Sequence, residues 1–310
     1  MYDPWPSLPY ESWKPTCDTL HRYCQIVGKI QLACTTRQNH WWNVAFLLDG
    51  RGMHTQPMRC GPEDFEIAFD LVDHRWAVRT SSGRESSVPL YPRPVAEFEE
   101  EVFHVLDGLG IDVSIDERPC EIPGPVVPFS EDREHASYDP DAVNAWYRIM
   151  LSSRRVFEDF RSRFLGKASP VLFYWGSFDL AVTRYSGRRA PARPGADSIT
   201  REAYSHEDSS AGIWPGTESL GGPWYYAYTA PAPKGYGDVP VEPPNARFDP
   251  GLGEFVLLYE AVRRSRSPRE TLMRFLQSTY EAGADRGGWD RANLERHEPL
   301  GGAEEAELPH

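Results

Sequence analysis

Apolar residues that recur at steps of three and four positions predict several helices. From Cys17 to Cys34 such positions are Leu20, Cys24, Val27 and Ile30, a spacing that places the side chains on one face of a helix. Similar spacing predicts helices over 95–109, 141–164, 254–264 and 269–283.

Between these helices, apolar and polar residues alternate. Phe65, Ile67 and Phe69 are separated by Glu66 and Ala68, which is the period of a strand with one buried face. Related patterns predict strands near 76–78, 88–91, 111–115, 171–185, 204, 211–214 and 224–229, after an apolar run over 41–48 that ends in a tight turn. Runs of antiparallel strands with helices on either side predict an α+β fold of antiparallel sheets flanked by helices.

The order helix, strands, helix occurs twice along the chain. It defines an N-terminal half over 1–118 and a C-terminal half over 141–290, with a crossing segment over 119–140 that contains five Pro, and an acidic tail over 291–310. Two similar halves packed together are one interpretation of this order, and one large domain is the other.

The net charge of −13 limits the classes of possible partners. An acidic chain without a dense basic stripe repels phosphate backbones, so we expect no nucleic-acid partner. No apolar run is long enough for a membrane span, so we expect no membrane partner either. Five Cys without a CxxC pair favour reduced thiols and a cytoplasmic location over a disulfide framework. The oligomeric state stays open.

Several motifs are more particular than generic packing requires. They are Thr19-Leu20-His21 with Gln25-Ile26-Val27-Gly28-Lys29; Asn39-His40-Trp41-Trp42; Phe65-Glu66-Ile67 with Asp73-His74; His135-Ala136 with Tyr138-Asp139; the run from Trp175 to Arg184; and Tyr204-Ser205-His206-Glu207 with Trp214-Pro215-Gly216. In this set the chain resembles, over roughly 5–295, a bacterial family of unknown function numbered 5996. The resemblance implies one whole-chain module and no particular reaction.

Five of the nine histidines lie in these motifs, namely His21, His40, His74, His135 and His206. Imidazole is a common ligand of zinc, copper and iron. We therefore expect His206, His135 and His40 to be metal ligands, with His206 and His135 also as catalytic groups. No HxH, HxxxH or HExxH spacing supports a local metal site, and each His has a structural alternative in a turn or the core.

Further candidates lie on the predicted strands. Asp179 alternates with apolar neighbours and is expected, with Glu207, to support a catalytic His. Arg184 falls on the opposite face by strict alternation, and a bulge would be needed to re-aim it as a clamp for an anionic substrate. Trp175, Trp214 and Trp41 are expected to line a substrate site, with a core role as the alternative.

These observations favour an enzyme that acts on a small organic, anionic substrate in a His-rich pocket between the two halves. An iron, copper or zinc ion is the expected cofactor in this hypothesis. Two alternatives remain open: a metal-free enzyme that uses acid–base groups, and a non-catalytic protein that binds a small metabolite.

Overall fold

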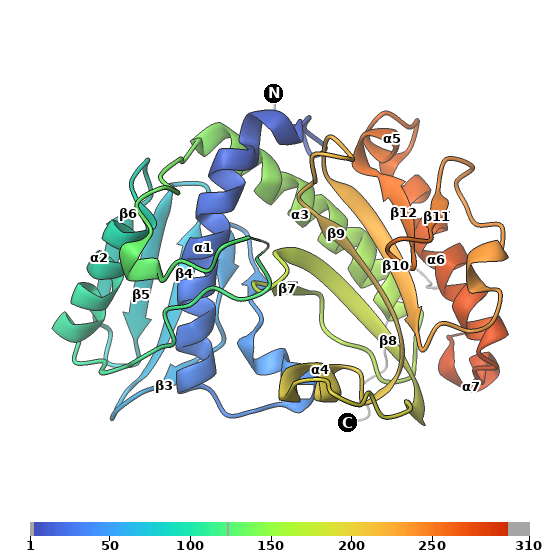
Figure 1. Ribbon diagram of the computed structural model, residues 1–310, viewed down its shortest axis with the longest axis horizontal. Coiled ribbons are helices and arrows are strands. Elements are labelled where there is room, and N and C mark those ends of the chain that lie inside the picture. Colours follow the sequence, from blue (N-terminus) through green and yellow to red (C-terminus); the bar gives the residue numbers. More distant parts are fainter. Residues whose placement is uncertain (1–2, 123, 297–310) are drawn as a thin grey trace, which may run out of the picture.

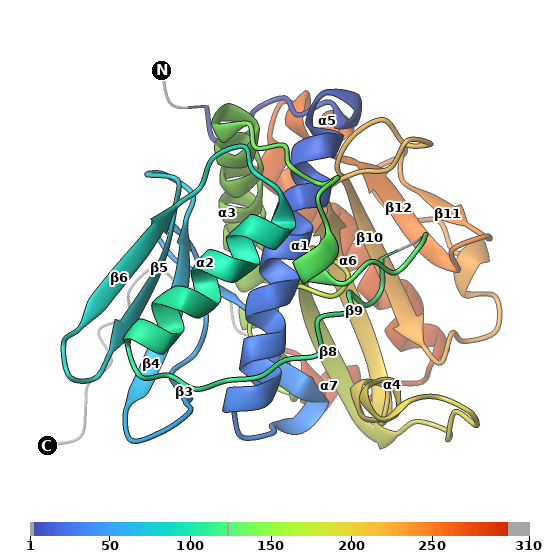
Figure 2. The same ribbon diagram turned by 60° about the vertical axis from the view of Figure 1, so that its left-hand side comes forward.

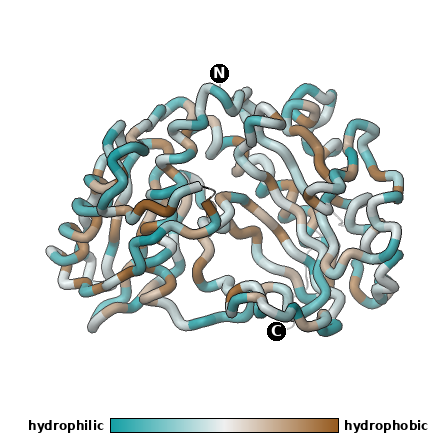
Figure 3. The backbone as a smooth tube through the Cα atoms, viewed as in Figure 1, coloured by the Kyte–Doolittle hydropathy of each residue, from teal (hydrophilic) through white to brown (hydrophobic). Residues whose placement is uncertain are grey.

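In the computed structural model, which describes residues 3–122 and 124–296, two six-stranded antiparallel sheets stand next to each other, with helices packed on them (Figure 1). The α+β fold of antiparallel sheets flanked by helices is therefore confirmed. In Figure 3, hydrophilic stretches prevail on the outer loops, while hydrophobic stretches are concentrated in the interior. No helix in the described ranges is long and apolar enough to cross a membrane.

The first half begins with helix α1 (Tyr10–Cys34), followed by the short 3-10 helix η1 (Asn39–Val44). Its sheet has the order β1-β2-β4-β5-β6, with β3 paired to β4. The strands are β1 (Leu47–Leu48), β2 (Gly52–His54), β3 (Met58–Arg59), β4 (Asp64–Asp70), β5 (Arg75–Thr80) and β6 (Glu85–Pro89). Helix α2 (Val95–Gly108) then packs next to α1 on this sheet (Figure 2).

The crossing segment holds the 3-10 helix η2 (Phe129–Glu131) and leads into the second half. The second sheet has the order β11-β12-β10-β9-β8-β7. Its strands are β7 (Leu172–Tyr174), β8 (Asp179–Arg189), β9 (His206–Trp214), β10 (Trp224–Ala230), β11 (Arg247–Asp249) and β12 (Glu254–Leu258). The helical elements of this half are α3 (Pro140–Ser162), α4 (Ser198–Ala203), η3 (Tyr236–Asp238), α5 (Tyr259–Arg263), α6 (Pro268–Arg286) and α7 (Arg291–Leu294).

The two sheets meet at their first strands. Phe46, just before β1, and Phe173 in β7 exchange two backbone hydrogen bonds of 2.9 Å. From this junction each sheet proceeds outward largely in sequence order. One continuous hydrophobic core includes residues of both halves, from Leu8 to Trp289. That the halves arose by duplication stays a prediction.

The two faces of the second sheet have different surroundings. Helices α3 and α6 pack on one face, against β8, β9 and β10. There Leu180 and Val182 point into the main hydrophobic core. The other face carries the separate aromatic cluster of Ala181, Trp224, Tyr226 and Val256. That second face is turned toward α1, η1 and the crossing segment, and it carries the site described below.

Several sequence expectations for secondary structure are wrong. The stretch 254–264, expected to be one helix, is strand β12 followed by α5, because residues 254–258 pair with β10 and β11. Residues 111–115 form no strand, and Tyr204 ends α4. In the run 41–48, η1 takes up the first part and only β1 is a strand. These short segments follow their tertiary partners and not their local propensity.

The expectation of five reduced cysteines is also wrong. Cys34, at the end of α1, and Cys60, after β3, form a disulfide. Cys17, Cys24 and Cys120 are free thiols. Sequence spacing could not reveal the bond, because its partners are 26 residues apart and meet only when β3 folds back onto α1.

Candidate functional site

A cavity of about 530 Å³ lies over the open face of the second sheet, and both halves of the chain line it. The N-terminal half contributes side chains from α1 and η1, and the crossing segment adds Cys120 and Glu121. Helix α4 forms part of the wall. The sheet supplies the floor, which is made of Tyr174, Asp179, Ala181, Thr183, Tyr185, Asp208, Ser210, Tyr226 and Tyr228.

Strand alternation explains the composition of the floor. On β8, Asp179, Ala181, Thr183 and Tyr185 point into the cavity, and the residues between them point to the helices. Asp208 and Ser210 of β9 and Tyr226 and Tyr228 of β10 share the cavity face. At Gly212 a Cβ atom would stand 2.5 Å from the Tyr226 hydroxyl, so the absence of a side chain there leaves room for that hydroxyl to reach Asp179.

Asp179 is the most strongly held acid in the cavity. The Ser177 hydroxyl donates to its Oδ1 and the Tyr226 hydroxyl to its Oδ2. Burial raises the pKa of Asp179 to about 6, against the lowering effect of these two hydrogen bonds. A carboxyl group with this pKa changes protonation state near neutral pH, as a general acid or base requires.

Asp208 is buried in a different way. Its side chain is 2% exposed, and its Oδ1 has no hydrogen-bond partner within the described part of the chain. Burial raises the pKa of Asp208 well above its ordinary value, and the charge of Arg193 lowers it. A buried acceptor without a donor is costly, so a donor from a ligand would stabilise this carboxyl group.

Two more carboxyl groups near Asp179 have a raised pKa. Burial raises the pKa of Glu121, which lines the cavity. Glu254 of β12 has its pKa raised to about 7 by burial and then by the charges of Asp179 and Asp249. Repulsion also links Glu121 to Asp179, since the Glu121 charge raises the Asp179 pKa.

Two residues of the first motif fix the cavity wall. His21 Nε2 lies 2.9 Å from the carbonyl oxygens of both Trp175 and Gly176, in the turn between β7 and β8. Gln25 bonds the backbone N–H and carbonyl of Cys120, at 2.9 and 2.6 Å. Because both side chains come from α1, they join the turn, the helix and the crossing segment, and their role is structural.

Trp175 forms part of the same wall. Its ring lies over Gly28, where a Cβ atom would come within 2.2 Å of the indole, and its Nε1 donates to the Val44 carbonyl at 2.8 Å. Trp41 also lines the cavity, from η1. His40 and Trp41 adopt left-handed backbone angles, with φ of 56° and 60°, which residues other than glycine rarely adopt.

The structure brings two of the three expected metal ligands together. The rings of His40 and His206 lie 5.8 Å apart, edge to face. However, Lys167 donates to His40 Nε2 at 2.6 Å, and His40 Nδ1 lies 3.1 Å from the Ala203 carbonyl. Both ring nitrogens of His40 are therefore occupied by protein groups. Burial lowers the pKa of His40, of Lys167 and of His206.

His135 lies elsewhere, in the crossing segment, where it contacts the first residue of α2. Its Nδ1 is 2.9 Å from Asp132 Oδ2, its carbonyl accepts from Val95, and Asp132 also pairs with Arg22 at 3.1 Å. It does not line the cavity. Among residues 3–122 and 124–296, no three His, Cys, Asp or Glu side chains are grouped so that they could hold a metal ion. The geometry thus gives no support to the set of His206, His135 and His40.

Arg184 points away from the cavity, as strict alternation requires. Its guanidinium lies 3.4 Å from the centre of the Phe160 ring and 4.4 Å from that of Tyr280, and it donates to the Phe160 carbonyl. Only 1% of Arg184 is exposed. The bulge considered for this strand comes later, between Tyr185 and Arg189. The interpretation of Arg184 as a clamp for an anionic substrate therefore has no support here.

Glu207 and Trp214 also lie outside the cavity lining. Glu207 accepts from Ser186 and Arg188. Trp214 packs against Trp224 at 4.7 Å and against Tyr226 at 5.1 Å between ring centroids. Of the expected site residues, Asp179, Trp175, Trp41 and His40 line the cavity, and His206 stands next to it.

Sequence reasoning missed Asp208, Tyr226, Tyr228 and Glu121. One signal was present: on a strand that begins at His206, Asp208 shares a face with Ser210, opposite Ala211 and Ile213. A carboxylate on an otherwise buried strand is uncommon unless it is paired. For Glu121, in an irregular segment, no pattern was available.

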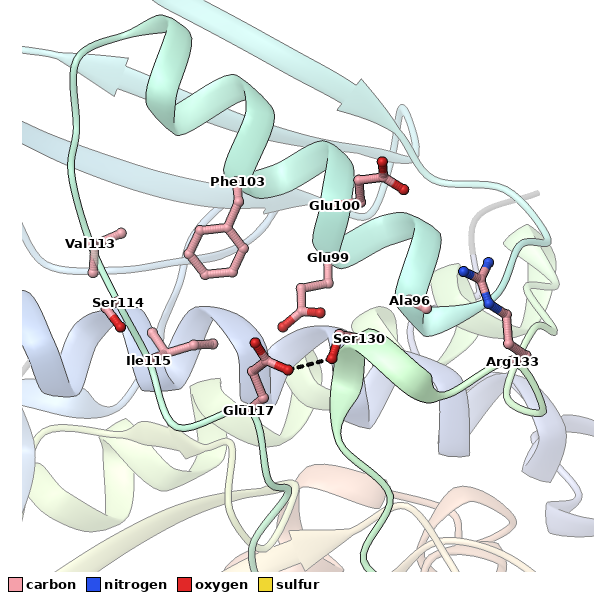
Figure 4. A pocket seen from close by; sticks show the side chains of 10 residues that line it. All are labelled: Ala96, Glu99, Glu100, Phe103, Val113, Ser114, Ile115, Glu117, Ser130 and Arg133. Carbon is pink, nitrogen blue, oxygen red and sulfur yellow. Dashed lines mark hydrogen bonds between the residues drawn. The ribbon is translucent and has the colours of Figure 1, made fainter.

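A second cavity of about 430 Å³ lies between α2, residues 113–117 that follow this helix, and the crossing segment. Glu99 points toward Glu117, whose carboxylate accepts from Ser130 (Figure 4). Burial, followed by the Glu117 charge, raises the pKa of Glu99 to about 7, and its Oε1 has no hydrogen-bond partner in the described chain. This cavity is lined by fewer aromatic groups than the first and contains none of the expected site residues.

Comparison with known proteins adds a family but no activity. No curated protein and no solved structure matches the chain. A family model described as a family of unknown function, DUF5996, matches residues 5–296. Since this range covers nearly the whole chain and includes every residue that lines the cavity, the chain belongs to the DUF5996 family.

Proposed function

We propose that the protein is an enzyme that binds a small organic molecule in the cavity between its halves and transfers a proton to or from it through Asp179. The observation that carries this proposal is the buried Asp179 carboxyl group, which lines the cavity and is held by Ser177 and Tyr226. This is the metal-free form of the enzyme hypothesis, and it replaces the metal-dependent form because His40 has no free ring nitrogen.

The surroundings of Asp179 suit such a role. Two fixed hydroxyl groups orient the carboxylate, which keeps the cost of positioning low at the moment of proton transfer. A cavity of about 530 Å³ is within the range used for small molecules, and aromatic walls are typical of such sites. Burial raises the pKa of Asp179 to about 6, so a large fraction of the group can accept a proton at neutral pH.

The test is a search for turnover with a defined mixture of small metabolites. Consumption of each compound is followed by mass spectrometry for the wild-type protein, for Asp179→Asn and for the control Glu207→Gln, which changes a carboxylate that does not line the cavity. We expect one compound to be consumed by the wild type and the control, and about 100-fold more slowly by Asp179→Asn.

Equal turnover by Asp179→Asn would overturn the assignment of Asp179. If compounds bind in the cavity but none is consumed, the protein is instead a non-catalytic binding protein for small metabolites.

A cytoplasmic location remains part of the proposal. The disulfide between Cys34 and Cys60 is uncommon in reducing compartments, so trapping the thiols of these two residues in intact cells tests the location. Two trapped thiols would support a cytoplasmic location, and an intact disulfide would contradict it.

A further inference from the structure

The charges that face the cavity are mostly acidic. Glu121, Asp179 and Asp208 line it, and the amine of Lys29 is the one basic group of Lys or Arg type among the described lining residues. Lys167 lies behind His40 and donates to it. Arg193 lies on the ring of Tyr204, 3.7 Å from its centre, at the exposed edge. Where these carboxyl groups are ionised, an anionic ligand would therefore meet more repulsion than attraction.

Among these carboxyl groups, Asp208 offers a ligand a specific hydrogen-bond acceptor. The residue is 2% exposed, it lines the cavity, and its Oδ1 has no donor within the described chain. Thr183 and Ser210, its neighbours on the floor, bond to each other at 2.9 Å. A ligand N–H group is the donor that would satisfy Oδ1, and a charged one makes the stronger bond.

The aromatic side chains around these carboxyl groups suit a cation as well. Tyr226 and Tyr228 are stacked, with 6.2 Å between ring centroids and 9° between planes. Tyr204 donates or accepts a hydrogen bond with Tyr228 at 3.2 Å. The faces of such rings attract ammonium and guanidinium groups. Burial raises the pKa of Tyr228 well above its ordinary value, so the phenol stays neutral.

We infer that the cavity selects small organic cations, namely amines or guanidines with an apolar or aromatic body, and that Asp208 is the residue that anchors the positive group. This inference rests on the proposed function, because it names the substrate class of the same cavity. It reverses the expectation of an anionic substrate, which depended on Arg184.

Proton release should accompany binding. Burial raises the pKa of Asp208 and of Asp179 in the empty cavity, with Arg193 opposing the shift at Asp208 and Glu121 adding to it at Asp179. A bound cation favours the ionised carboxylates, so protons leave as it enters. The affinity for a cation should therefore increase as the pH rises and these two carboxyl groups ionise, Asp179 with a pKa of about 6 and Asp208 with a pKa well above its ordinary value.

The experiment compares three probes with one skeleton by calorimetry: tyramine as the cation, 2-(4-hydroxyphenyl)ethanol as the neutral analogue, and 4-hydroxyphenylacetate as the anion. We expect tyramine to bind about 10-fold or more tightly than the neutral alcohol, and the carboxylate to bind least. Titrations of tyramine in two buffers of different ionisation enthalpy should show proton release.

Asp208→Asn should remove the preference for tyramine, whereas Glu207→Gln, a change of equal charge on the adjacent residue of the same strand, should retain it. The wild-type preference and the proton release need no variant, so they test the inference even if Asp208→Asn does not fold. Equal or tighter binding of the alcohol or the carboxylate overturns it, as does the absence of tyramine binding at about 10 mM.

The two proposals can fail separately. If the neutral or anionic probe binds best while Asp179→Asn still abolishes turnover, cation selectivity is wrong and the acid–base function stands. If tyramine is preferred while Asp179→Asn turns over its substrate at the wild-type rate, the cavity selects cations and Asp179 is not the proton-transfer group.

Discussion

Asp179 and Arg184 lie on the same strand, and their difference shows how a sheet separates structural from chemical roles. Both side chains are almost fully buried, at 3% and 1% exposure. Five positions separate them, an odd number, so they point to opposite faces of β8. Asp179 reaches a cavity that can admit a ligand, whereas Arg184 is enclosed by Phe160, Phe164 and Tyr280.

The covering elements explain the difference. Helices α3 and α6 are long and lie directly on the Arg184 face, so their side chains fill the space there. The Asp179 face is turned toward one end of α1, η1, the short α4 and the irregular crossing segment. These elements close the edges of the cavity and leave its centre open. Burial of a charged group therefore does not by itself identify a functional site.

The largest expected effect that distinguishes the two faces is on turnover. Asp179→Asn should slow the reaction about 100-fold or more, since it removes the proton-transfer group. Arg184→Met should leave the rate per folded molecule near the wild-type value, because Arg184 does not reach the cavity. Single-turnover rates measured for both variants would contradict the comparison if the Arg184 variant were the slower one.

Stability should show the reverse order. Arg184→Met removes the side-chain donor to the Phe160 carbonyl, which keeps the Arg163 backbone N–H, and it removes the ring contacts of the guanidinium, so unfolding should become easier by about 3 kcal/mol. Urea denaturation measures the loss. A variant as stable as the wild type would show that the buried guanidinium contributes little.

The pH dependence of stability tests the environment of Asp179. Because burial raises its folded pKa to about 6, from an ordinary value of 3.8, the folded state holds the proton more tightly than the unfolded chain. The contribution of Asp179 to the free energy of unfolding is thus fully present below pH 4. As the pH rises through about 6, the free energy of unfolding falls by about 2–3 kcal/mol. The stability of Asp179→Asn, expressed as the difference from the wild type at the same pH, should therefore be higher at pH 8 than at pH 4.

A smaller loss is expected at the wall of the cavity. Gly28→Ala would place a Cβ atom 2.2 Å from the Trp175 indole, and the ring must move to accommodate it. Overpacking of this kind costs about 1–3 kcal/mol, which thermal melting can detect. Because the displaced ring lines the cavity, ligand affinity should fall as well. The matched control Gly50→Ala has open space around its Cβ and should change neither.

The smallest effect is expected from removal of metal ions. Since both nitrogens of His40 bond to protein groups, dialysis against a chelator should leave turnover and melting temperature unchanged. Elemental analysis before and after dialysis supplies the control. Loss of activity that returns with added iron, copper or zinc would restore the metal-dependent hypothesis.

Periodicity in the sequence is enough to predict the long elements and the alternation within them. The helices α1, α2, α3 and α6 and the strand β4 follow directly from periodicity, and the opposite orientation of Asp179 and Arg184 follows from their odd spacing. Which face of the sheet holds a cavity depends on tertiary packing. That choice depends on contacts between residues far apart in the chain, such as Gln25 with Cys120 and Phe46 with Phe173. Local periodicity carries no information about such contacts, because it reports which face of an element is apolar and not what packs against it.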